Sequence, residues 1–153
     1  MKKLENMLAQ LLTYSKHAAE SNPQISTVSV AWHIEHSLMV ILKIVETVCQ
    51  SDPANYQWKF NWIRTLVFLK KTFPRGKAKA PDAVKPQPSS NQNLEDLATQ
   101  AHAAIIKLSK ARKNQFFKHT FFGNLNRRGT FTMLYLHTKH HLHIIQDIVN
   151  LQP

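Results

Sequence analysis

The sequence contains little cysteine and glycine and few acidic residues. The first two shortages each argue against a class of protein. Its single cysteine, Cys49, cannot form an internal disulfide, which favours a reducing compartment and a cytoplasmic location. Three glycines in 153 residues are too few for the many tight turns of an all-β fold. No apolar run is long enough to span a bilayer, and the first residues lack a secretory-signal pattern. We therefore expect no membrane partner.

Acidic residues are outnumbered by basic ones. The chain has 9 Asp and Glu against 20 Lys and Arg, which gives a net charge of +11. Such a surplus is compatible with an anionic partner. However, the basic residues are spread along the chain and no nucleic-acid-reading motif accompanies them. We therefore expect the basic residues to form a solvated surface. As an alternative to an enzyme, the chain could be a non-enzymatic basic helical module that binds nucleic acid or an acidic partner.

Helical periodicity dominates the chain, and no segment shows the clean alternation of a β-strand. Apolar residues recur every three or four positions in five segments. These segments predict helices over about residues 2–19, 30–51, 58–71, 94–110 and 126–150. Four long helices and a shorter one predict an all-α bundle, with residues 1–153 forming a single domain.

Caps and prolines delimit these helices. Ser26 or Ser29 can cap the second helix, and Asn91 or Asn93 can cap the fourth. Between the third and fourth helices, residues 72–90 are basic and rich in proline. Proline at this density prevents a regular helix or a central strand. We therefore expect a long basic loop over residues 72–90.

Two further stretches contain apolar and aromatic residues. Trp62, Leu66 and Leu69 mark the apolar side of the third helix. The phenylalanines of residues 116–122 lie in a short connection before the last helix. We expect them to serve core and loop packing rather than base stacking.

Nine histidines are present, and four of them crowd into residues 137–143. At about 100° per residue, His137 and His141 lie about 40° apart, on the apolar stripe of the last helix. This spacing lets two imidazoles reach one ion. His140 flanks the stripe, and His143 points away from it toward solvent.

Histidines on an inward face need a polar partner. An unpaired buried polar group costs on the order of 1–3 kcal/mol, and either a carbonyl, a carboxylate or a metal ion can remove that cost. The second helix carries His33 on its own apolar stripe and His36 about 60° from that stripe. His33 is the preferred third ligand, with His36 either a supporting partner or the true ligand. Three nitrogen ligands and an open position are typical of a catalytic site.

This pattern resembles the DinB-like superfamily of metalloenzymes, which includes thiol-dependent transferases. His33-Ile34 on the second helix matches the family's first ligand position, and His137 and His141 match its late i, i+4 pair. Residues 119–123 are similar to a loop that precedes the last helix in one uncharacterised branch. The family usually has one histidine in the second helix, whereas this chain has two.

The resemblance implies a four-helix bundle of up-down-down-up order that forms a homodimer. It implies a divalent ion (Zn, Ni, Mn or Fe) on His33, His137 and His141, with His36 and His140 as alternative or supporting residues. The expected reaction is either hydrolysis or the transfer of a thiol cofactor. The expected partner is a small-molecule substrate. No catalytic residue or further cofactor can be identified, because no Ser/His/Asp set, glycine-rich phosphate loop or carboxylate pair is present.

Overall fold

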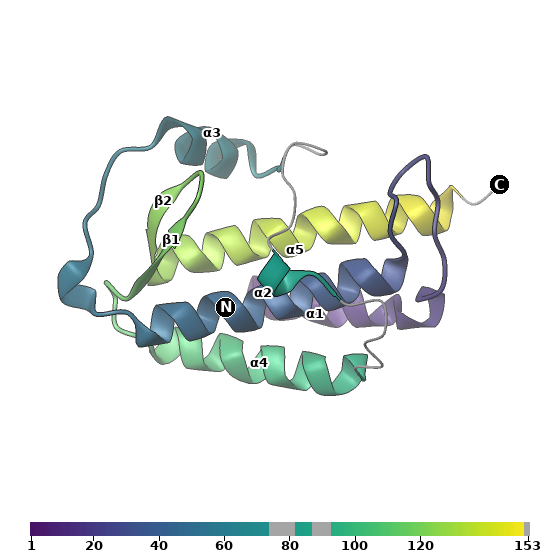
Figure 1. The fold of residues 1–153 in the computed structure, drawn as a ribbon, viewed down its shortest axis with the longest axis horizontal. Helices are drawn as coiled ribbons and strands as arrows, with labels where there is room; N and C mark the ends of the chain where they lie inside the picture. The colour runs from purple at the N-terminus through teal and green to yellow at the C-terminus, as the bar shows by residue number, and fades with distance from the viewer. Residues whose placement is uncertain (74–81, 87–92, 152–153) are drawn as a thin grey trace.

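Four helices lie alongside one another around a common core (Figure 1). They are α1 (Lys2–Thr13), α2 (Val30–Gln50), α4 (Leu94–Lys110) and α5 (Arg127–Asn150). The computed structural model describes residues 1–73, 82–86 and 93–151. α2 packs against α4 and α5, and α1 packs against the same two helices. The most deeply buried side chains of the four helices include Leu4, Leu11, Ile34, Leu38, Ile41, Ile105, Leu108, Leu134, Ile145 and Ile148.

Side-chain caps set the beginnings of three of these helices. The Ser29 hydroxyl accepts from the backbone at the start of α2, and the side chains of Asn93 and Asn126 do the same for α4 and α5. Of the two candidates named for each of the second and fourth helices, Ser29 and Asn93 are therefore the caps. α1 ends at Thr13, earlier than predicted, and a short 3₁₀ turn, η1 (Ser15–His17), follows it.

A two-stranded hairpin precedes α5, so the chain is mostly helical rather than all-α. β1 (Phe116–His119) pairs antiparallel with β2 (Gly123–Asn126), and the opposed Phe117 and Leu125 are both buried. Gly123 opens the second strand at φ 68°, a conformation that glycine adopts without strain. The expected short connection is thus a hairpin, because strands of four residues are too short to show an alternating pattern.

α3 (Trp62–Lys70) lies at one end of the molecule beside the hairpin (Figure 1). It begins four residues later than predicted, where the Asn61 side chain caps it by accepting from the backbone of Arg64. The Arg64 guanidinium donates to the carbonyls of Phe122 and Asn124, at 3.2 and 3.4 Å. These bonds fix one side of α3 against the hairpin.

The apolar side of α3, marked by Trp62, Leu66 and Leu69, is exposed rather than packed in the core. Their side chains are 67%, 39% and 78% exposed, whereas Val67 is buried and Phe68 contacts the hairpin. The physical reason is that α3 rests on the hairpin through the opposite side of the helix. Periodicity finds the apolar stripe, but it does not say whether another element covers that stripe.

The predicted loop of residues 72–90 lies partly outside the described residues. Its described part includes a short 3₁₀ helix, η3 (Asp82–Val84), which packs on α2 and buries Val84. Another 3₁₀ helix, η2 (Pro53–Asn55), follows α2. Within the described part of the chain, no helix combines the length and the apolar character needed to cross a bilayer.

Candidate metal centre

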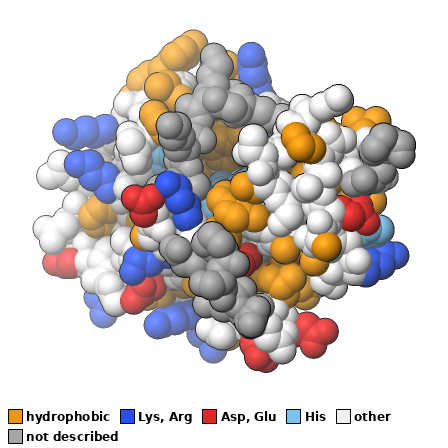
Figure 2. All heavy atoms as spheres, turned by 45° about the vertical axis from the view of Figure 1, so that its right-hand side comes forward, with side chains coloured by type: hydrophobic (Ala, Val, Ile, Leu, Met, Phe, Trp, Pro, Cys, Tyr) orange, Lys and Arg blue, Asp and Glu red, His pale blue; other side chains and the backbone are white. Residues whose placement is uncertain are grey.

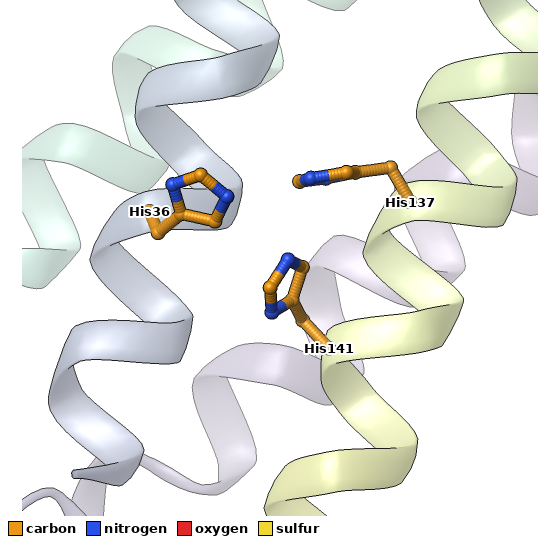
Figure 3. Close-up of side chains that lie close together, drawn as sticks. All are labelled: His36, His137 and His141. Atoms are coloured by element: carbon orange, nitrogen blue, oxygen red, sulfur yellow. The ribbon is translucent and has the colours of Figure 1, made fainter. Parts of the chain in front are cut away.

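Three histidine rings meet in the space between α2 and α5 (Figure 3). His36 comes from α2, and His137 and His141 come from successive turns of α5. One ring nitrogen from each lies within 4.8 Å of the other two. The ring centroids are 5.2 Å apart for His36 and His137, 4.8 Å for His36 and His141, and 4.6 Å for His137 and His141. One ion placed between the rings can therefore be reached by all three.

His36 is oriented by two contacts outside the group of three. Its ring stacks on Trp32, one turn earlier on α2, with centroids 4.7 Å apart and planes 17° from parallel. Its Nδ1 lies 2.7 Å from the carbonyl oxygen of Val84 in η3. Because a carbonyl only accepts, Nδ1 must carry the hydrogen and donate it. In the neutral ring Nε2 then holds a free lone pair, which is the form that a metal ligand requires.

His33 lies outside this group of three and contacts one of its members, His141. Its Nδ1 is 2.9 Å from Nδ1 of His141, and its Nε2 is 2.9 Å from Oγ of Ser26. If His141 donates through Nδ1, His33 accepts there and donates from Nε2 to the serine oxygen. Nε2 of His141 then has its lone pair free. The structure thus groups His36 with His137 and His141, and it places the preferred candidate His33 beside His141.

Three other histidines on or near α5 lie outside the group of three. The ring centroid of His140 lies 5.2 Å from that of His141, but His140 is not one of the three grouped residues. His143 is exposed, as expected. His119 on β1 is half-buried and stacks on Phe122, with centroids 4.2 Å apart. His119 is therefore part of the aromatic packing at the hairpin end of the site.

Burial keeps the clustered histidines neutral. Burial lowers the pKa of His137 well below its usual value, and the positive charge of neighbouring histidines lowers it further. Burial followed by the charges of His137 and His36 does the same to the pKa of His141. Burial also lowers the pKa of His36, against the hydrogen bond to Val84, which raises it. Neutral imidazoles near pH 7 have the lone pairs that bind metal ions.

A buried nitrogen without a partner also fits a metal ion. Among the described residues, Nδ1 of His137 is buried and has no hydrogen-bond partner. A buried polar atom left unsatisfied costs about 1–3 kcal/mol. Together with the donor set of three imidazoles, this atom makes the site suited to a divalent cation, since cation binding engages ring nitrogens that otherwise face apolar surroundings.

The other unsatisfied atom on α5 gives a prediction about stability. Thr138 is fully buried, and its Oγ1 has no hydrogen-bond partner among the described residues. Thr138→Val keeps the shape and removes the polar atom, so the free energy of unfolding should rise by about 1 kcal/mol. Urea denaturation followed by circular dichroism measures this change. Thr132→Val is the control, because the Thr132 hydroxyl donates to the carbonyl of Arg128 at 3.2 Å. This substitution should give no gain in stability. A loss of stability in Thr138→Val would contradict the prediction.

Comparison with known proteins gives no match. No protein-family model, curated protein or solved structure matches this chain. The resemblance to the DinB-like superfamily therefore rests on the histidine pattern of the chain itself. The functional argument accordingly depends on the geometry of the site.

Proposed function

We propose that the protein is a metal-dependent enzyme of the DinB-like type, with a divalent ion bound by His36, His137 and His141. The observation that supports this proposal is the convergence of three neutral imidazoles from two helices, with one ring nitrogen of each within 4.8 Å of the others. Three nitrogen ligands with a remaining open position are typical of catalytic sites rather than closed structural ones. The up-down-down-up order of the helices, the single domain and a homodimer belong to the same proposal.

The residues around the three ligands have supporting roles in this proposal. Val84 and Trp32 hold the ring of His36 in the orientation that leaves Nε2 free. His33 supports His141 through its Nδ1. A divalent ion held by three imidazoles supplies Lewis acidity, which makes water or a thiol more acidic near neutral pH. Hydrolysis and thiol transfer both use this chemistry, and we propose one of the two.

A hollow beside the ligands offers a place for the substrate. It has a volume of about 170 Å³, and its lining includes Phe73, Lys139 and His140. The ring of His140 faces both Phe73 and His141, at centroid distances of 6.1 and 5.2 Å, so the hollow adjoins the site. Lys71 also lines it, and two lysines favour an anionic group on a small-molecule substrate.

Metal content tests the proposal. Protein purified without a histidine tag should contain about one equivalent of Zn, Ni, Mn or Fe by plasma mass spectrometry. His137→Ala/His141→Ala should contain almost none. His143→Ala is the matched control, because it removes an exposed histidine from the same helix. Absence of metal from the wild type, even after reconstitution with each ion, would refute the proposal; a bound ion would justify screens for hydrolase and thiol-transferase activity.

A further inference from the structure

The outward side of α3 and the residues around it form a large apolar surface. In the described part of the chain, six of the ten exposed large hydrophobic side chains lie here. These six, which we call the α3 face, are Phe60, Trp62, Ile63, Leu66, Leu69 and Phe121. Contiguous exposed apolar patches on proteins in water generally mark a site of interaction.

Helix geometry explains why these side chains share one side. At about 100° per residue, Trp62, Leu66 and Leu69 fall within an arc of about 60°. Val67, which is buried, and Phe68, whose ring centroid lies 5.7 Å from that of Phe122, project from the opposite half of the helix. α3 is therefore held on the body of the protein by one side, and its apolar stripe is free on the other.

The α3 face continues beyond the helix itself. The rings of Phe60 and Trp62 have centroids 6.4 Å apart, which extends the stripe onto the segment before α3. The Asn61 side chain donates to the carbonyl of Phe121 at 2.9 Å, which brings the hairpin loop alongside. Figure 2 shows hydrophobic side chains at the upper edge of the molecule, where α3 lies in Figure 1.

The charge around the α3 face has one sign. No Asp or Glu occurs from residue 53 to residue 73, whereas four Lys and Arg do. Lys59 and Lys70 flank the exposed aromatic residues, are themselves exposed, and have no ion-pair partner among the described residues. An anionic partner complements this charge, whereas a second copy of the chain would bring like charges together.

We propose that the α3 face docks on an anionic lipid surface. Tryptophan and phenylalanine beside lysine are the residues that place a helix at the headgroup level of a bilayer, with the apolar side chains in the acyl boundary. Leu66 and Leu69 favour lipid over single-stranded nucleic acid, because bases stack on aromatic rings and make no comparable use of aliphatic side chains. A docked helix need not span the bilayer, so this proposal is compatible with the lack of a spanning segment, but it departs from the sequence-based expectation of no membrane partner.

Vesicle binding tests the proposal on the full chain. The wild type should sediment with vesicles of phosphatidylcholine and phosphatidylglycerol and much less with phosphatidylcholine alone. Tryptophan emission should shift to the blue on binding, since Trp62 of the α3 face is exposed in the free protein. Lys59→Gln/Lys70→Gln should weaken binding by about fivefold for each lysine lost. Trp62→Ser/Leu69→Ser should abolish the blue shift.

Controls separate docking from misfolding and from other partners. Ile106→Ser removes an exposed apolar residue from α4 and should bind vesicles like the wild type. Unchanged helicity of Trp62→Ser/Leu69→Ser by circular dichroism shows that the fold is intact. Each of three results would overturn the proposal: no vesicle binding at low salt, equal binding by Trp62→Ser/Leu69→Ser, or a face-dependent preference for single-stranded nucleic acid or for self-association over vesicles.

Discussion

Lowering the pH from about 7 to about 5 should destabilise the metal-free protein steeply. Burial lowers the pKa of His36, His137 and His141 in the folded state, and it lowers the pKa of His119 to about 4. In the unfolded chain each has a pKa of about 6.5, so the unfolded state binds more protons below that pH. The free energy of unfolding is therefore highest above pH ~6.5 and falls as the pH drops toward the folded pKa values.

The slope of that decline is the quantity to measure. Each histidine that stays neutral in the folded state contributes at most about 1.4 kcal/mol per pH unit to the slope of the free energy of unfolding. Urea denaturation of metal-free protein between about pH 7.5 and 5 gives the slope. His137→Gln should make it shallower, because one buried titrating group is lost. His143→Gln, an exposed position two residues from His141, should leave it unchanged. A free energy of unfolding that does not change over this range would contradict the prediction.

His36→Ala should remove bound metal, whereas His33→Ala should only weaken its binding. In the structure His36 belongs to the group of three, and His33 contacts His141 from outside it. Loss of a ligand leaves two imidazoles, too few for a stable site of this kind. Loss of a supporting partner typically costs 10–100-fold in metal affinity. Competition with a chromophoric chelator measures both variants.

The same pair of variants distinguishes the two histidines of α2. Circular dichroism should show equal helicity for both, so that a difference in affinity reflects the ligands. Ser26→Ala is a milder third variant, since it removes only the hydroxyl that faces Nε2 of His33. The opposite result, with metal retained by His36→Ala and lost by His33→Ala, would make His33 the ligand that the sequence first suggests.

The main helices were predictable because their signals are local. Caps such as Ser29 and Asn93 stand directly before apolar residues at helical spacing, and the helices begin where these signals lie. The pairing of His137 and His141 was predictable for the same reason, since one turn of helix separates them. The hairpin was missed because the pairing of Phe117 with Leu125 depends on two segments that are each too short to alternate clearly.

The position of His36 depends on contacts between elements that are distant in the sequence. A helical projection puts His36 at the edge of an apolar stripe, but α2 is covered by both α4 and α5, so His33 and His36 are both buried. The carbonyl of Val84 that orients His36 comes from a segment without helical periodicity. Any residue can supply a backbone carbonyl, so no side-chain pattern in the sequence indicates that Val84 is the partner of His36.

The group of three histidines also has a consequence for the order in which the chain is made. His36 is synthesised before His137 and His141, which belong to the last helix described. More than a hundred residues separate His36 from His141, so the nascent chain holds only one ring of the group until His137 has been added. Chains that stop before α5 lack two of the three rings. Capture of an ion by all three would therefore mark a chain that has been made through α5 and folded.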